Sequence, residues 1–214
     1  EQNEIIKQQY AMQLGDLQAQ TEALTMQTTA LDTQKAVADS VYSVEQARYE
    51  NEKAFSQLQE SRLERQLTEL QRVGADRAEQ ITIIRAIAQE QLNQAKIEYN
   101  SNIASIKQRV LKAQLDRKAV DIKVEEIKLQ IEMLRLQAQE IRDTGERQAA
   151  LARINAQIET ALSTSRGMVQ AANAQLNATR NIAIYQEQNA AYAYRGKVEA
   201  IQAASAERER SIAL

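Results

Sequence analysis

Apolar residues recur with a period of seven between Tyr99 and Ile141, and the period hardly breaks over this stretch. Two rows with alternating spacings of three and four residues match the a and d positions of a left-handed coiled coil. Only Arg117 interrupts them. The two rows are Ile103, Val110, Arg117, Val124, Ile131, Ala138 and Ile106, Ala113, Val120, Ile127, Leu134, Ile141. The pattern predicts one long helix, roughly 65 Å in length at 1.5 Å per residue.

A second apolar row lies about 170° around the same helix, at 100° per residue. It consists of Leu115, Ile122, Leu129 and Leu136, flanked by Leu111 and Met133. Two-stranded coiled coils expose these positions to water, so we expect this helix to pack on two sides. Two interpretations are open. Either the apolar residues of both rows form an interface between copies, or the chain is a monomeric bundle with its own helices on both sides.

The residues up to Val73 predict a helix with a weaker seam. Its apolar row keeps the seven-residue spacing, but the companion row is mostly polar. The two rows are Tyr10, Leu17, Leu24, Leu31, Ala38 and Leu14, Thr21, Thr28, Lys35. We expect the apolar face to continue through Val37, Val41, Val44, Phe55 and Leu58, and then through Leu63, Leu67, Leu70 and Val73.

Glycines give the predicted breaks between helices. Gly74 can take the left-handed conformation that closes a helix, and Asp76 with Glu79 resembles an N-cap with its capping-box partner. Asp143 to Gly145 is the second predicted break, and Ser163 to Gly167 and Gly196 are weaker ones. We therefore divide the chain into an N-terminal long helix (1–73), a central heptad rod (74–145) and C-terminal Ala-rich helices (146–214).

Composition supports an all-α fold of long coiled-coil-like helices in a hairpin or extended bundle. The 214 residues include no proline, five glycines and 4% aromatic residues, and strand signals are missing. Alanine buries little area, so we expect stability to depend on helix length, close alanine packing and association with other copies. The chain begins with Glu1 rather than methionine, and we expect it to be part of a longer product.

Charge argues against a dedicated nucleic-acid binder, because the formal net charge is -2. Residues 1–73 carry 7 basic and 12 acidic side chains, whereas 146–214 carry 8 and 6. Segments of unlike charge from neighbouring copies would attract each other weakly. Non-specific passage of DNA through a channel lined by glutamine-rich helices remains compatible with this composition.

Catalytic chemistry is not predicted. The chain has no histidine and no cysteine, and its glycines form no phosphate-binding loop. Carboxylates such as Glu125 lie among basic residues such as Lys128 at helical spacings, which is typical of surface ion pairs. We predict a non-enzyme without catalytic, cofactor-binding or metal-binding residues.

No run of 18 apolar residues occurs that would span a bilayer as a single helix, so contact with a membrane surface is the one kind of membrane interaction that the pattern leaves open. The C-terminal segment brings tyrosines close to basic residues, a combination that suits a membrane interface. These residues are Tyr185, Tyr192, Tyr194, Arg180, Arg195 and Lys197. Ordinary helix packing of the tyrosines is the alternative interpretation.

In composition and residue pattern, the first two-thirds of the chain resembles the internal virion proteins, also called core or ejection proteins, of short-tailed bacteriophages. The likeness lies in the Ala/Gln-rich helical chain and in the charge-poor segment AMQLGDLQAQTEALTMQTTALDTQ (residues 11–34). It involves no diagnostic motif, and no residue role follows from it. The resemblance implies a protein packaged near the portal that leaves ahead of the genome and assembles into a conduit across the host envelope. It also implies homo-oligomers, with portal, tail and other ejection proteins as partners.

The runner-up interpretation is a peripheral membrane-remodelling or scaffold coiled coil, located in the cytoplasm or on a membrane surface. A third is an ordinary cytoplasmic adaptor bundle. Rings or tubes in solution favour the virion interpretation, and liposome binding favours the membrane interpretation.

Overall fold

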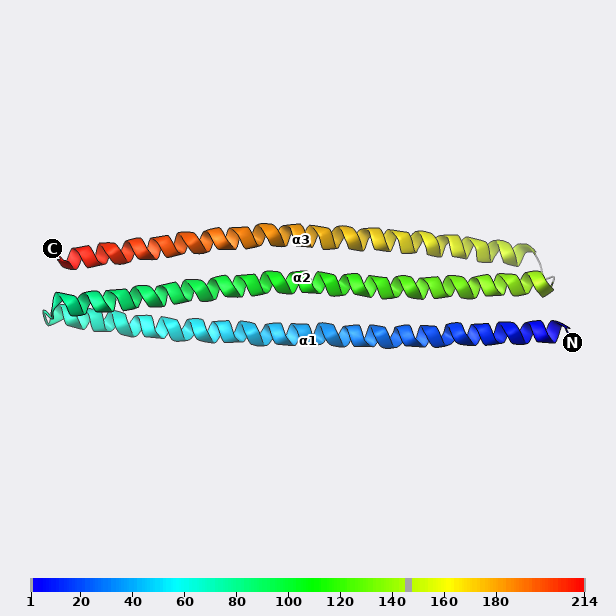
Figure 1. The fold of residues 1–214 in the computed structure, drawn as a ribbon, viewed down its shortest axis with the longest axis horizontal. Helices are drawn as coiled ribbons and strands as arrows, with labels where there is room; N and C mark the ends of the chain where they lie inside the picture. The colour runs from blue at the N-terminus through cyan, green and yellow to red at the C-terminus, as the bar shows by residue number, and fades with distance from the viewer. Residues whose placement is uncertain (1, 145–147, 214) are drawn as a thin grey trace. The chain divides into compact units, whose positions relative to one another are not determined.

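The computed structural model describes residues 2–144 and 148–213, and nearly all of them are helical. The helices are α1 (Gln2–Arg72), α2 (Arg77–Thr144) and α3 (Gln148–Ala213). Within the described ranges no residue lies in a strand, so the predicted all-α fold is confirmed. α1 and α2 form an antiparallel hairpin, and α3 runs antiparallel to α2 (Figure 1).

The turn between α1 and α2 follows the predicted break at Gly74. Gly74 has a φ of 68°, and its N–H donates to the carbonyl of Gln71 at 3.3 Å. The N–H of Ala75 donates to the carbonyl of Leu70 at 2.9 Å, which completes a Schellman motif. The carbonyl of Asp76 accepts from the N–H of Gln80 at 3.2 Å, so Asp76 occupies the N-cap position of α2.

The two weaker predicted breaks, at residues 163–167 and at Gly196, are wrong. Gly167 and Gly196 both lie inside α3, which continues without interruption through residues 163–167. A single glycine costs about 1 kcal/mol relative to alanine in a helix. This cost is small beside the stability of a helix of 66 residues that contains no proline, so the helix continues. α2 ends at Thr144 as predicted, whereas Gly145 lies outside the described residues.

The chain forms two compact units, each built from a piece of all three helices. Unit 1 contains Glu1–Val37 and Val110–Thr179, and unit 2 contains Ala38–Arg109 and Arg180–Leu214. Within each unit, α2 lies between α1 and α3 (Figure 1). The segments 1–73, 74–145 and 146–214 therefore correspond to helices and not to compact units.

Unit 1 has an apolar core and the half-polar α1 seam that the heptads predict. Its buried side chains are Leu17, Leu31, Leu115, Val124, Ile131, Ala138 and Ile154. The hydroxyls of Thr21 and Thr28 donate to carbonyls one turn earlier in α1, at 2.9 and 3.1 Å. Lys35 Nζ lies 2.8 Å from a carboxylate oxygen of Asp116 in α2. The polar seam positions thus have partners inside the unit.

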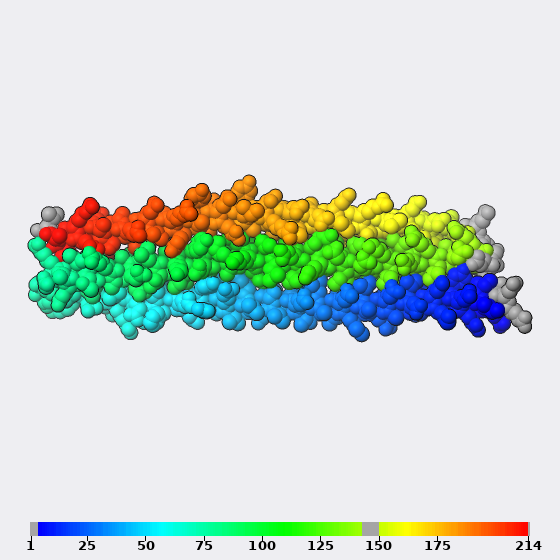
Figure 2. Space-filling view, viewed as in Figure 1, coloured from blue at the N-terminus to red at the C-terminus, as the bar shows by residue number. Residues whose placement is uncertain are grey.

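The most deeply buried side chains of unit 2 lie near the turn between α1 and α2. Ile84 and Ile87 are only 2% and 1% exposed, and Ala95, Ile106 and Ala183 are also buried. Side chains of neighbouring helices meet along the face that Figure 2 shows. Much of the remaining interface between α1 and α2 is polar, and this feature leads to the candidate site.

Candidate functional site

The side chains that the sequence assigns to an interface between copies are mostly covered within one chain. Leu111 is 39% exposed, whereas Leu115 is 6% exposed. Also buried are Ile106, Val124 and Ile131. Half-buried are Ile103, Val110, Val120, Ile122, Ile127, Leu129, Met133, Leu134 and Leu136.

The two apolar rows of α2 face different helices of the same chain. Leu136 of the second row and Leu17 of α1 line a shared groove of unit 1, with a volume of about 430 Å³. Arg117, which interrupts the first row, donates from Nε to Oδ1 of Asn173 in α3 at 2.7 Å. The chain's own helices therefore contact both rows and cover them in part, which is the arrangement of the monomeric alternative. Nine of the fourteen side chains are half-buried, so an interface between copies through these rows stays a prediction.

In unit 2 the interface between α1 and α2 consists largely of polar contacts. Ser56, 4% exposed, donates from Oγ to a carboxylate oxygen of Glu90 at 2.7 Å and to its carbonyl at 3.2 Å. Gln91 and Gln94 donate to the two carboxylate oxygens of Glu60 at 2.6 and 2.7 Å. In the described part of the chain, every buried side-chain N or O atom has a hydrogen-bond partner. The network is therefore satisfied internally.

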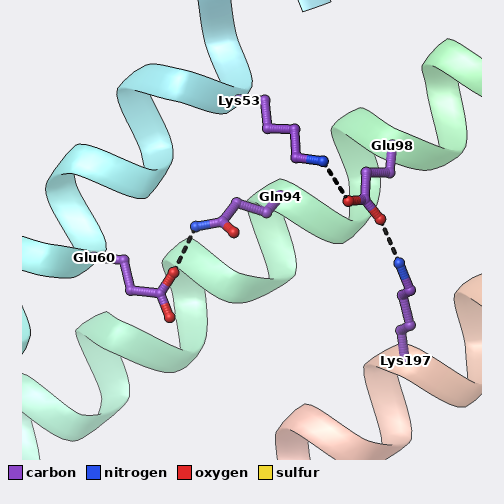
Figure 3. A network of polar contacts seen from close by, with 5 residues as sticks. All are labelled: Lys53, Glu60, Gln94, Glu98 and Lys197. Carbon is purple, nitrogen blue, oxygen red and sulfur yellow. Dashed lines mark hydrogen bonds and ion pairs between the residues drawn. The ribbon is translucent and has the colours of Figure 1, made fainter. Parts of the chain in front are cut away.

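Glu98 joins all three helices of unit 2 (Figure 3). One carboxylate oxygen lies 2.7 Å from Nζ of Lys53 in α1, and the other accepts from Nζ of Lys197 in α3. The hydrogen bonds from Lys197 and Lys53 lower the pKa of Glu98 below its usual value. Glu98 therefore shows that Lys53 of α1 and Lys197 of α3 lie at the same level along α2.

In the middle of α1 in unit 2 polar residues hold the inner face, and four large apolar side chains lie on the outside, whereas Leu63, Leu67 and Leu70 nearer the turn are half-buried as predicted. Val41, Val44, Phe55 and Leu58 form the outer α1 group, with exposed fractions between 50% for Leu58 and 69% for Val44. Val37, in unit 1, is also exposed. The sequence predicts that these residues continue the seam of α1. That prediction is wrong, because Gln46, Lys53 and Ser56 make the contacts with α2.

A second group of apolar side chains is exposed on α3. Ile182, Ile184, Tyr185 and Tyr192 form the outer α3 group, with exposed fractions between 53% for Ile184 and 70% for Tyr192. Tyr194 differs from them, because its ring stacks on Tyr99 of α2 with centroids 5.1 Å apart. Ordinary helix packing thus accounts for Tyr194 and leaves Tyr185 and Tyr192 without such a role.

The outer groups could have been found from one signal in the sequence. Gln46, Lys53, Ser56 and Glu60 recur at spacings of three, four and seven, which is the spacing of an inner helical face. Glu90, Gln94, Glu98 and Ser101 follow one another at spacings of four, four and three in α2, which also place them on one helical face. Two matching polar faces predict a polar interface, and the apolar residues of α1 must then face away from it.

Among the described residues, no group of three or more histidine, cysteine or acidic residues is placed to hold a metal ion. Glu125 pairs with Lys128 at 2.6 Å, and both side chains are more than half exposed, which is the predicted surface pair. In the same part of the chain, no helix has the length and apolar character needed to cross a bilayer.

Comparison with known proteins finds no match to a family model, to a curated protein or to a solved structure. The fold and the surface of the chain are thus the basis for a functional proposal.

Proposed function

We propose that this protein is a non-catalytic structural protein that assembles with further copies of itself through the outer faces of α1 and α3. In the specific form of this proposal, it is an internal virion protein that builds a ring or channel for ejection of phage DNA into the host. Portal, tail and other ejection proteins are its proposed partners. It resides in the virion and, after ejection, in the host envelope.

The observation that carries the proposal is the inverted arrangement of α1 in unit 2. Lys53 and Ser56 bind polar groups of α2, while Val44 and Phe55 are 69% and 63% exposed. Burying a large apolar side chain contributes roughly 1.5–3 kcal/mol. Covering these exposed side chains with a second copy would therefore stabilise the assembly. Contiguous exposed apolar groups mark interaction sites.

The non-catalytic part of the proposal rests on side-chain chemistry. The 214 residues hold no histidine and no cysteine, and polar groups of the network in unit 2 bind one another. The virion assignment rests on the resemblance of the Ala/Gln-rich chain to ejection proteins. The net charge of -2 suits a channel that lets DNA slide through, because strongly basic walls would hold the phosphates.

Light scattering across a range of protein concentrations tests self-association. We expect particles of several chains, and symmetric rings or tubes in electron micrographs. The variant Val44→Glu should shift the protein towards the monomer, whereas Ser61→Glu, which adds the same charge at an exposed position of α1 outside residues 38–58, should not. A compact monomer at the highest concentration overturns the proposal. Mass spectrometry of purified virions from a phage that carries this sequence tests the virion assignment.

A membrane-surface scaffold is the second candidate, favoured by the exposed rings of Tyr185 and Tyr192 near Arg180 and Arg195. Tyrosine and arginine suit the headgroup region of a bilayer. Flotation with anionic liposomes separates the candidates. Binding that the double variant Tyr185→Ser/Tyr192→Ser abolishes supports the scaffold, and protein that stays in the soluble fraction supports the virion component.

A further inference from the structure

We infer that the outer α1 group of one copy packs against the outer α3 group of a second copy, with the two helices parallel and at the same level. This inference rests on the proposed self-association and names its contact surface. Both groups belong to unit 2, and α2 separates them within one chain (Figure 1). Each copy therefore presents two different apolar groups, one on each outer helix of unit 2.

The level of the two groups follows from Glu98. Lys53 and Lys197 bind the same carboxylate, and α1 and α3 run in the same direction because each is antiparallel to α2. Val41 lies twelve residues before Lys53, and Tyr185 lies twelve residues before Lys197. Val41 and Tyr185 therefore lie at the same level along α2.

Contacts one segment further along α2 support this level. Gln108 donates to a carboxylate oxygen of Asp39 in α1 at 3.0 Å, and the adjacent Arg109 donates to Oε1 of Gln186 in α3 at 3.4 Å. Asp39 and Gln186 directly flank the level of Val41 and Tyr185. A neighbour placed beside unit 2 without a shift along the helix axes would bring Val41 and Val44 against Ile182 and Tyr185.

Charge favours pairing of α1 with α3 over pairing of like helices. Residues 38–58 of α1 carry four acidic and two basic side chains, a net charge of -2, whereas residues 180–197 of α3 carry three basic and one acidic, a net charge of +2. Without Lys53 and Lys197, which bind Glu98, the net charges are -3 and +1. Two α1 segments or two α3 segments carry net charge of the same sign, whereas an α1 segment and an α3 segment attract each other.

A contact between two different faces has a structural consequence. A heterologous interface leaves one free face at each end of a dimer, so further copies add in the same way. Assembly then closes into a ring where the rotation between copies allows it, or continues as an open array. The parallel, level contact therefore produces higher oligomers and does not stop at the dimer.

Cysteine cross-linking tests the contact, and the natural chain provides a background with no cysteine. The double variant Val41→Cys/Tyr185→Cys places thiols at the same level on the two outer helices, α1 and α3, of unit 2. Two interhelical spacings of about 8–10 Å separate them within one chain, too far for a disulfide. Mild oxidation should give a ladder of dimers, trimers and larger species on a non-reducing gel, which a reductant collapses.

The matched control is Val41→Cys/Ala203→Cys, which moves the second thiol by eighteen residues, roughly 27 Å at 1.5 Å per residue. It should give at least fivefold less ladder than the level-matched pair. Circular dichroism of both variants checks that each remains helical. Val44→Glu added to the level-matched pair should abolish the ladder without loss of helicity.

The outcomes separate this inference from the proposal beneath it. Dimers from either single variant alone, an intramolecular disulfide, or an equal ladder from the shifted pair overturn the α1-to-α3 contact. If light scattering still finds oligomers in those cases, self-association stands and uses another surface. A monomer in light scattering with no cross-links overturns both.

Discussion

Tyr194 of α3 stacks on Tyr99 of α2, with ring centroids 5.1 Å apart and an angle of 29° between the ring planes. Both residues belong to unit 2, and they lie next to Glu98, which binds Lys197. An aromatic contact and a polar contact thus hold α3 against the same segment of α2. This segment is the reference from which the level of the outer groups is derived.

Replacing Tyr194 tests the contribution of the stacked pair. Tyr194→Leu should lower the free energy of unfolding by about 0.5–1.5 kcal/mol, because it keeps an apolar side chain but loses the ring contact. Tyr192→Leu is the control, since Tyr192 is 70% exposed and its replacement should change stability by less than about 0.5 kcal/mol. Urea denaturation of dilute protein measures both. Equal effects from the two variants would contradict the stacking role.

The lysine contacts of Glu98 make part of the stability depend on pH. Lys197 and Lys53 lower the pKa of Glu98 in the folded chain, so the unfolded chain takes up this proton more readily. The contribution is complete above the ordinary glutamate pKa of about 4.3 and is lost as pH falls through the lowered folded-state pKa. Glu98→Gln should therefore be less stable than the natural chain at pH 7, and the difference should vanish in acid.

The carboxyl of Glu98 is about a third exposed, so we expect a difference under about 1 kcal/mol at pH 7. Denaturation of both proteins at pH 7, 5, 4 and 3 gives this difference directly. A gap between them that grows in acid would mean that the lysines do not stabilise the ionised carboxylate.

Glycine replacements should have opposite effects at two positions. Gly74 has a φ of 68°, and Gly74→Ala should destabilise the chain by about 1–2 kcal/mol, because alanine avoids the left-handed region. Gly196 lies inside α3, and Gly196→Ala should stabilise the chain by about 0.5–1 kcal/mol. An added Cβ meets no atom within 4 Å at either site, so backbone conformation alone decides the sign. Thermal unfolding measures both shifts.

Leu115 distinguishes coverage by the same chain from coverage by a neighbour. Leu115 is 6% exposed, and Leu115→Ala should cost about 2–5 kcal/mol at any protein concentration. Leu111→Ala should cost less, because Leu111 is 39% exposed. Unfolding measured over a hundredfold range of concentration provides the test. A cost that rises with concentration would return the second apolar row of α2 to an interface between copies.

The sequence predicted the helical pattern and the first turn correctly, because these depend on residue spacing and on the backbone conformation of single residues. The heptads of α2, the half-polar seam around Leu17 and Leu31, and the left-handed Gly74 all follow from spacing and backbone conformation. The breaks at residues 163–167 and at Gly196 were wrong because a glycine was treated as a stop. Its cost is small beside the combined stability of a 66-residue helix.

The candidate surface was not predicted because it depends on which faces meet. Val44 and Phe55 are apolar, and Ser56 and Lys53 are polar, so hydrophobicity alone places the first pair inside. The actual choice depends on Glu90 and Glu98, which lie 34 and 45 residues away along the chain from their partners. A pairing between distant segments is not visible in the pattern of either segment alone.

The Schellman turn at Gly74 also bears on the order in which the chain acquires its structure. Near this turn the partners are close in sequence, as with Glu60 and Gln91, which are 31 residues apart. Lys35 and Asp116 of unit 1 are 81 residues apart, so bringing them together closes a much longer loop at a greater entropic cost. Contacts between α1 and α2 should therefore form first near Gly74 and then progressively further from it. In refolding, the α1 and α2 segments of unit 2 should gain protection from hydrogen exchange earlier than the α1 and α2 segments of unit 1.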